Sequence, residues 1–331
     1  MYVGVDYHKR YSFATKMDER GQIIEQIKLN NDQETLRAYA ATLPRGSKIA
    51  LEATGGWYHF YEVLEDSGLD IHLAHPLKTR AIAEARIKTD TIDATMLAHL
   101  LRSNLLPASY IAPREIRDIR EVLRYRASLV SIRVSLKNKI HALLSKNGIL
   151  FPYTNILGKK GRLFLKNLQL RDSYRQCLDG YLRLAETLTA LIEELEATIM
   201  ALAEKNDQAM LLTTIPGIGY FSALLILSEI GVIQRFPSAK KLCSYAALVP
   251  RVHSSGGKTR YGSITKQGSK WLRWILVETS KHYVKSCPRL KRLYDSVTHR
   301  HGKNTARVAI AREMLKIIYC MLRDQRAFVR G

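Results

Sequence analysis

The chain has 331 residues, of which 46% are hydrophobic and 25% charged, a composition that is typical of folded domains and excludes a disordered protein. Its 52 Lys and Arg outnumber its 30 Asp and Glu, which gives a formal net charge of +22. The excess is uneven: residues 1–110 carry 13 basic and 14 acidic side chains, whereas residues 235–331 carry 22 and 4. So positive a segment concentrates polyanions, and nucleic acid is therefore the expected partner.

Several other classes of protein are not expected. No apolar run approaches the roughly 20 residues that a membrane-spanning helix needs, and the first residues carry no secretory signal. The cysteines lack any CxxC spacing, so we expect neither a zinc site nor a disulfide framework: Cys177, Cys243, Cys287 and Cys320. These features predict a cytoplasmic protein, nucleoid-associated when bound to DNA and without a membrane partner.

The first 110 residues are predicted to form an α/β domain. Short apolar runs indicate a three-strand meander, and the spacing of apolar residues then predicts alternating helices and strands. In chain order the strands are 2–6, 12–17, 23–29, 48–51 and 69–74, with helices at 32–43, 57–67 and 90–102. Three antiparallel strands followed by alternating helix and strand is the order expected of a ribonuclease-H-like domain.

Residues 111–207 are predicted to be a helical linker. The basic segment 113–145 has no internal Pro or Gly, and segment 183–205 places leucines near heptad spacing. A loop region at 148–161 separates them. We expect the two helices to pair as an antiparallel arm or as a coiled coil that joins two protomers; a plain two-helix bundle inside one protomer is an equal alternative.

Residues 208–331 are predicted to be mostly helical, interrupted by a polar stretch at 253–268. The segment 215–219 reads as a helix-hairpin-helix turn, whose backbone N–H groups suit a phosphate, although an ordinary turn between helices fits equally well. Basic residues surround the polar stretch, and a basic loop without chemistry is the simplest interpretation of its composition. The residues expected to contact nucleic acid are Pro216, Gly217, Gly219, Arg251, Lys258, Arg260, Lys266 and Lys270.

Four acidic residues are placed so that their side chains converge. Asp6 lies in the first strand, Glu52 ends the fourth, and Asp90 and Asp93 are one helical turn apart. In a ribonuclease-H-like sheet the first and fourth strands are neighbours and a later helix packs beside them. Clustered carboxylates repel one another unless a cation lies among them, and oxygen ligands favour Mg²⁺ or Mn²⁺. Taken singly, Asp90 and Asp93 are also typical of a helix N-terminus.

Together these motifs resemble the DEDD transposases of the "one-ten" family of bacterial insertion sequences, which also includes the Piv DNA invertases. The resemblance extends from the first strand to about residue 312. It is carried by Val3–Asp6, Leu51–Gly56, Lys88–Ala94, Ile215–Gly219 and Ala247–Arg251.

The resemblance implies a RuvC-like catalytic domain at 1–110, a coiled-coil linker that mediates dimerisation at 111–207 and a C-terminal transposase domain at 208–331. It implies that Asp6, Glu52, Asp90 and Asp93 bind Mg²⁺ or Mn²⁺. It also implies that Ser255 attacks a DNA phosphate and forms a covalent phosphoserine intermediate, with Ser254 as the alternative register. The implied partners are donor and target double-stranded DNA, a structured bridge RNA that guides the protein, and further copies of the chain, as dimers that assemble into tetramers.

Three functions follow from these observations. The main expectation is an RNA-guided DNA recombinase, an enzyme that cleaves and rejoins DNA. The alternative is a metal-dependent, structure-selective nuclease of RuvC type without serine chemistry. A non-catalytic nucleic-acid-binding protein is the third, and the four-acid pattern argues against it.

Overall fold

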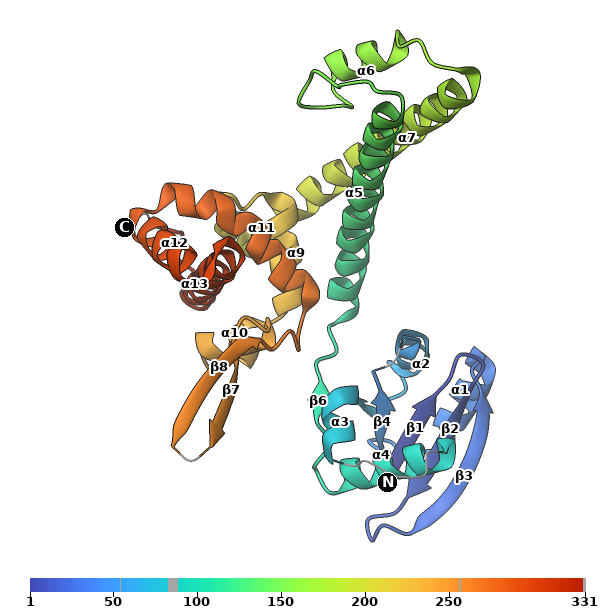
Figure 1. The fold of residues 1–331 in the computed structure, drawn as a ribbon. Helices are drawn as coiled ribbons and strands as arrows, with labels where there is room; N and C mark the ends of the chain where they lie inside the picture. The colour runs from blue at the N-terminus through green and yellow to red at the C-terminus, as the bar shows by residue number, and fades with distance from the viewer. Residues whose placement is uncertain (54, 83–88, 256, 330–331) are drawn as a thin grey trace. The chain divides into compact units, whose positions relative to one another are not determined.

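The computed structural model describes residues 1–53, 55–82, 89–255 and 257–329, which form two compact units, 1–111 and 112–331 (Figure 1). The first unit holds a six-stranded mixed sheet in the order β3-β2-β1-β4-β5-β6. Its strands are β1 (Tyr2–Tyr7), β2 (Tyr11–Met17), β3 (Ile23–Asn30), β4 (Lys48–Glu52), β5 (Asp70–Ala74) and β6 (Ala108–Ser109). The predicted meander is confirmed, because β1, β2 and β3 pair antiparallel.

Alternation along β1 divides the first unit into two layers around the sheet. Val3 and Val5 are fully buried in a core that also contains residues of α1 (Gln33–Ala41) and α2 (Trp57–Leu64). Gly4 lies on the opposite face, against α4 (Asp90–Arg102). A Cβ atom on Gly4 would lie 1.9 Å from the Ala94 carbonyl oxygen, so only glycine permits this close approach of helix to strand.

A short helix, α3 (Pro76–Ile82), follows β5 and had not been predicted. It begins with a proline, which is favourable in the first turn of a helix because the missing N–H would have no partner there. The prediction of a helix over 90–102 is confirmed by α4, whose bounds are the same.

The second unit begins with two long helices that pair along each other, which we call the arm: α5 (Arg114–Lys146) and α7 (Asp172–Glu204). The end of α5 packs with the beginning of α7, so the two run antiparallel within one chain. α7 begins before the predicted residue 183, and the short helix α6 (Lys159–Lys166) overlaps the predicted loop region.

The remaining helices pack around α9 (Tyr220–Ile230), in which every residue from Ser222 onward is buried, and around the last helix of the chain. They are α8 (Asp207–Thr213), η1 (Ile233–Arg235), α10 (Ala239–Tyr245), α11 (Lys270–Ser286), α12 (Pro288–His301) and α13 (Lys303–Asp324). The last of these, α13, contacts α10, α11 and α12. No helix in the described part of the chain has the length and apolarity needed to cross a bilayer.

The predicted polar stretch forms a β-hairpin instead of a loop. Strands β7 (Pro250–Ser255) and β8 (Lys258–Ile264) pair antiparallel, and Ser255 and Lys258 are the pair closest to the turn. In the sequence, two glycines stand between the strands. We call residues 250–264 the serine hairpin.

Candidate active site

The sheet register brings Asp6 and Glu52 to the same edge. β1 and β4 are parallel neighbours, and Val5 pairs with Leu51. Asp6 and Glu52 are the next residue on each strand, so both follow the last of these pairs. Asp6 is only 8% exposed, which is unusual for a carboxylate without compensating contacts.

α4 brings its own acidic residues to this edge. Thr89 caps the helix, because its hydroxyl accepts a hydrogen bond from the Ile92 amide at 3.2 Å. Asp90 and Asp93 lie in the first turn, and the Asp93 amide donates to the Thr89 carbonyl at 2.9 Å. The tight contact between Gly4 and α4 therefore determines how near Asp90 comes to β1.

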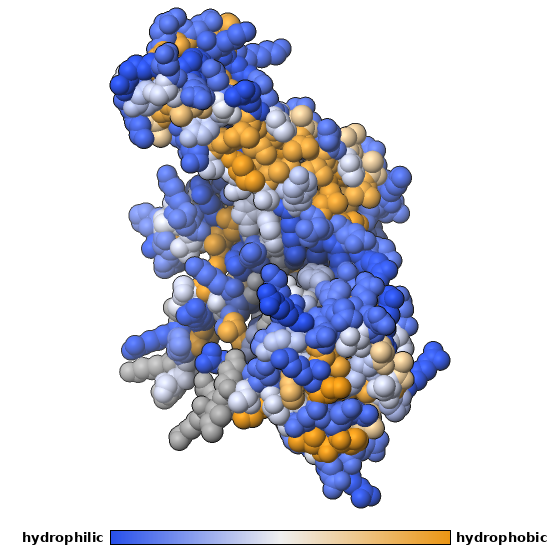
Figure 2. All heavy atoms as spheres, turned by 90° about the vertical axis from the view of Figure 1, so that its right-hand side faces the viewer, coloured by the Kyte–Doolittle hydropathy of each residue, from blue (hydrophilic) through white to orange (hydrophobic). Residues whose placement is uncertain are grey.

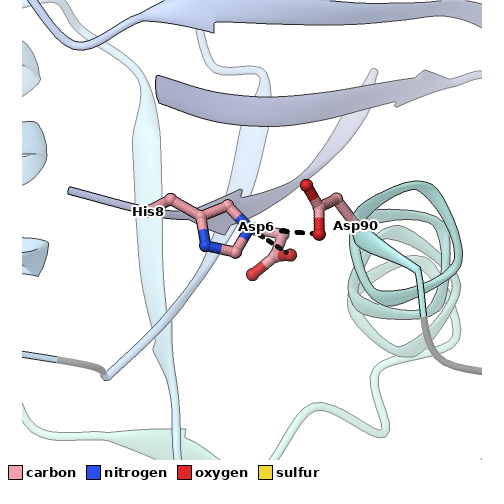
Figure 3. A group of neighbouring side chains, drawn as sticks. All are labelled: Asp6, His8 and Asp90. Atoms are coloured by element: carbon pink, nitrogen blue, oxygen red, sulfur yellow. Dashed lines mark ion pairs between the residues drawn. The ribbon is translucent and has the colours of Figure 1, made fainter. Parts of the chain in front are cut away.

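Three side chains form a cluster within the described residues: Asp6, His8 and Asp90 (Figure 3). One potential ligand atom from each lies within 4.8 Å of the other two. His8 Nε2 is 3.2 Å from Asp6 Oδ2 and 3.2 Å from Asp90 Oδ1. The two carboxylates thus converge on a single position, which the imidazole nitrogen takes in this structure.

Tyr11 completes the surroundings of Asp90. Its hydroxyl donates to Asp90 Oδ2 at 2.9 Å. This hydrogen bond, with a smaller contribution from His8, lowers the pKa of Asp90, and the same bond raises the pKa of Tyr11. The sequence interpretation missed both His8 and Tyr11 as members of the site. His8 follows directly after β1, so only an extension of the strand alternation by one residue would have placed it on the face of Asp6.

The other two acidic residues are close in the fold but outside this cluster. Among the described side chains, neither Glu52 nor Asp93 joins the three whose ligand atoms lie within 4.8 Å of one another. Both are half-buried and both make contacts of their own. The donor set nevertheless fits a hard divalent cation, since carboxylate oxygens converge where a positive charge is needed.

The serine hairpin presents its residues to solvent. Ser255 is exposed and ends β7. His253 pairs with Arg260 across the hairpin, and residues two apart on β7 share a face, so Ser255 lies on the side of His253. Ser254 is on the other face, where its Oγ lies 3.3 Å from Thr259 Oγ1.

Of the basic residues predicted to contact nucleic acid, four are exposed: Arg251, Arg260, Lys266 and Lys270. Lys258 is placed by its pairing with Ser255.

The predicted helix-hairpin-helix turn connects α8 to α9. Gly217 and Gly219 are exposed and Pro216 is half-buried. Gly217 has φ +90°, and a Cβ atom there would lie 2.5 Å from His282 Cβ of α11, so glycine is required by both conformation and packing. The Gly219 amide is already bonded to Ser222 Oγ at 2.9 Å, which leaves this N–H engaged within the helix cap.

Comparison with known proteins identifies the group to which the chain is similar. A family model of IS110-type DEDD proteins, described as "Transposase", matches residues 3–148, and one described as "Transposase IS116/IS110/IS902 family" matches residues 209–295. The transposase of insertion sequence IS1111A from Coxiella burnetii is 27% identical over 99% of this chain and 91% of its own length.

Two further relatives match parts or nearly all of the chain. The transposase of IS1328 from Yersinia enterocolitica is 25% identical over 96% of this chain and 95% of its own length. The pilin gene-inverting protein of Moraxella bovis is 34% identical over 44% of this chain and 46% of its own length. The two family matches together span well over half of the sequence, and the relatives agree with them. The chain belongs to the IS110 family of insertion-sequence transposases, the "one-ten" family that its motifs resemble.

Proposed function

We propose that this transposase is an RNA-guided DNA recombinase that cleaves and rejoins DNA with a divalent metal site in a RuvC-like domain and a serine nucleophile. The observation that carries the proposal is the convergence of the Asp6 and Asp90 carboxylates on one position beside the strand that bears Glu52. Buried and half-buried acids brought together from two separate elements are costly unless a positive charge lies between them.

The proposed metal ligands are Asp6, Glu52, Asp90 and Asp93, and the ion is Mg²⁺ or Mn²⁺. Bound metal would activate an attacking oxygen and stabilise the leaving oxygen of a phosphodiester. The chain's own part in this is to hold the ligands in place: the register of β1 and β4 aligns Asp6 with Glu52, and Gly4 lets α4 bring Asp90 to the same edge.

The proposed nucleophile is Ser255. Its hydroxyl loses a proton, its Oγ forms a bond to a DNA phosphorus, and the bond from that phosphorus to a deoxyribose oxygen breaks, with the proton passing to the released hydroxyl. Rejoining repeats these changes in reverse with the hydroxyl of another strand. His253 lies on the same face of β7 and is the candidate to accept the proton. Ser254 is the alternative nucleophile.

The proposed nucleic-acid partners are donor and target double-stranded DNA and a structured bridge RNA that selects both by base pairing. A protein that leaves sequence selection to an RNA needs to bind backbones, and the exposed cations around the serine hairpin support this assignment. The turn at Pro216, Gly217 and Gly219 is the proposed second contact with phosphates. The proposed location is the cytoplasm, at the nucleoid when the protein is bound to DNA.

The arm supports a proposed dimer that assembles into a tetramer. Large apolar side chains remain exposed along both helices, and Figure 2 shows that apolar surface gathers over this part of the molecule. The exposed residues are Tyr125, Ile132 and Val134 on α5 and Leu184 and Met200 on α7. Burying them against a second copy removes apolar surface from water, which favours association.

The second candidate is a metal-dependent, structure-selective nuclease of RuvC type. Both candidates use the acidic cluster, so a test has to separate them at the serine. We expect Ser255→Ala to abolish recombination of donor and target DNA by the purified protein with its bridge RNA, while the affinity for DNA is unchanged. Turnover on branched DNA that persists in this variant, without dependence on the serine, would establish the nuclease instead.

A further inference from the structure

The serine hairpin is attached to the helices of the second unit at its open end. We call this end, made of Val249 and residues 265–269, the hairpin foot. The Thr265 amide donates to the Val249 carbonyl at 3.0 Å, and the Ser269 amide donates to the Tyr245 carbonyl at 3.3 Å. Gly268 packs so closely there that a Cβ atom would lie 2.1 Å from the Tyr245 carbonyl oxygen. The foot is therefore fixed against the end of α10.

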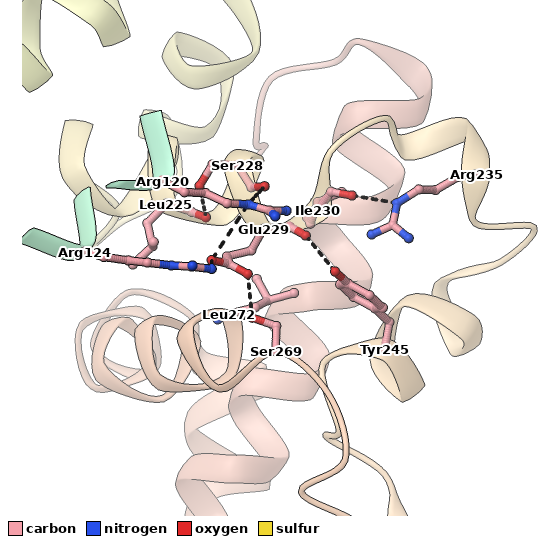
Figure 4. A network of polar contacts seen from close by, with 10 residues as sticks. All are labelled: Arg120, Arg124, Leu225, Ser228, Glu229, Ile230, Arg235, Tyr245, Ser269 and Leu272. Carbon is pink, nitrogen blue, oxygen red and sulfur yellow. Dashed lines mark hydrogen bonds and ion pairs between the residues drawn. The ribbon is translucent and has the colours of Figure 1, made fainter. Parts of the chain in front are cut away.

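A buried carboxylate lies behind this foot. Glu229 on α9 is 3% exposed, and its Oε2 accepts a hydrogen bond from Ser269 Oγ at 2.8 Å (Figure 4). Ser269 Oγ also accepts from the Leu272 amide at 3.0 Å, so it caps α11. The Tyr245 hydroxyl donates to the Glu229 carbonyl at 3.2 Å. Glu229 thus contacts both the foot, at Ser269, and the end of α10 to which the foot is attached, at Tyr245.

The same carboxylate is bound from the arm. Arg124 of α5 donates from Nη2 to Glu229 Oε1 at 2.6 Å. Arg120, one turn earlier, lies with its Nε 4.0 Å from Glu229 Oε1 and donates to the Ser228 carbonyl at 2.7 Å. One side chain therefore connects the first half of α5 to the hairpin foot, as Figure 4 shows.

We propose that Glu229, held between Arg124 and Ser269, is a positioning residue that sets the orientation of the serine hairpin and so the location of Ser255. This inference rests on the proposed role of Ser255. The strand from Pro250 to Ser255 spans about 17 Å, so a tilt of about 10° at the foot displaces Ser255 by about 3 Å. Misplacement by 1 Å is enough to cost about 100-fold in a reaction that needs aligned atoms.

The composition of the contact supports a positional role. A buried ion pair contributes little to stability compared with well-packed apolar residues of the same volume, whereas its directed hydrogen bonds hold neighbouring elements in one geometry. Most other residues of α9 from Ser222 onward are apolar. The Glu229 carboxylate accepts hydrogen bonds from Arg124 of α5 and from Ser269, the N-cap of α11.

The main test compares Ser269→Ala with Ser269→Thr. The alanine variant loses the hydroxyl that bonds Glu229, and the threonine variant keeps it. With purified full-length protein, bridge RNA and DNA, we expect the alanine variant to form the covalent DNA adduct on the order of 100-fold more slowly at unchanged DNA affinity. We expect the threonine variant to recover at least a third of the original rate.

Asn206→Ala is the matched control. Asn206 caps α8 through the Ala209 amide at 2.9 Å, so this variant removes the same kind of helix cap away from α10 and Glu229. We expect its adduct rate to stay within about threefold of the original. An equal loss of rate in both alanine variants would overturn the proposal, because it would indicate a general loss of stability.

Amide hydrogen exchange tests the position of the foot without any chemistry on DNA. In Ser269→Ala and in Glu229→Gln, which places an amide group against Arg124, we expect the Thr265 and Ser269 amides to exchange at least about 10-fold faster while α13 is unchanged. Unchanged exchange at the foot in both variants contradicts the proposal. If exchange quickens but Ser255→Ala still recombines DNA, the assigned role of Ser255 fails and the coupling of Glu229 to the foot stands.

Discussion

The acidic cluster and the serine hairpin are built in opposite ways. Asp6 is buried near the end of β1, an inner strand of the sheet. Its neighbours come from adjacent strands and from α4, which packs against Gly4. Ser255 is exposed at the turn of a two-stranded hairpin whose residues on β7 are exposed from Arg251 onward. The acidic cluster is held by the packing of its own neighbours, whereas the serine hairpin is held through the hairpin foot.

This difference corresponds to the two parts of the proposed reaction. Metal ligands need fixed positions, because a hard cation demands several oxygen atoms at defined distances. A serine that attacks DNA needs to reach a backbone that the protein does not enclose. Substitutions beside the acidic cluster should therefore act through local packing, and substitutions near the hairpin should act at a distance, through its attachment.

Removing the serine gives the largest expected effect. Ser255→Ala should lower the yield of recombined DNA by on the order of 10³-fold or more, since loss of the proposed nucleophile would remove the covalent step. The products are counted by sequencing the new junctions. Ser254→Ala is the control, because its hydroxyl lies on the other face near Thr259, and it should keep most activity. The reverse result would move the nucleophile to Ser254.

Removing a proposed metal ligand gives the second-largest expected effect. Asp6→Asn should weaken Mn²⁺ binding by more than about 100-fold, because it deletes the charged oxygen on which the cluster is built. Manganese binding is measured by electron paramagnetic resonance on the free protein. Asp70→Asn is the matched control: Asp70 lies 2.9 Å from His72 Nε2 on β5, a similar pair in the same sheet. Equal affinity in both variants would show that the ion binds elsewhere.

The close approach of α4 to β1 sharpens the comparison. Gly4→Ala should lower the local free energy of unfolding of β1 by about 2 kcal/mol, because the added methyl overlaps the Ala94 carbonyl. Hydrogen exchange of the β1 and β4 amides measures this loss. Gly180→Ala on α7 is the control, since a Cβ atom there meets no atom within 4 Å and alanine favours the helix. A neutral Gly4→Ala would mean that α4 does not depend on this contact.

The basic residues around the hairpin give the smallest effect. Arg260→Ala and Lys266→Ala should each reduce the slope of log affinity for DNA against log salt by about 1, as expected for one lost phosphate contact. Fluorescence anisotropy at several salt concentrations gives the slope. Lys48→Ala, an exposed residue of the neutral first unit, should leave it unchanged. Equal slopes in all three variants would remove Arg260 and Lys266 from the DNA contact.

The sequence predicted the first unit well because its signals are local. Apolar alternation marks the strands, and the order of elements makes β1 and β4 neighbours, which is what brings Asp6 and Glu52 to the same edge of the sheet. His8 was missed because it lies just past the end of β1, and Tyr11 was missed because its contact with Asp90 depends on the β1–β2 pairing, which side-chain type alone does not reveal. Spacing predicted four acids as metal ligands, of which the structure brings Asp6 and Asp90 into one cluster, whereas the contacts of His8 and Tyr11 come only from the fold.

The second unit shows where sequence patterns fail. The serine hairpin has polar residues on both faces, so it lacks the alternation of apolar and polar residues by which strands are recognised. The contact of Glu229 with Arg124 joins residues 105 positions apart, and the apolar spacing of α9 gives no sign of it. The sequence pattern predicted the start of α7 too late. The first turns of this helix carry few leucines, and Gly180 interrupts the apolar spacing.

The central claim is that Ser255 forms a covalent bond to DNA in a reaction that depends on the acidic cluster. The most direct test is to express the protein with its bridge RNA and flanking DNA, denature, digest, and search by mass spectrometry for a serine that carries a nucleotide. The account predicts an adduct on Ser255 that is absent in Asp6→Ala. Nicked DNA that requires Mg²⁺, with no adduct on any serine, would contradict it.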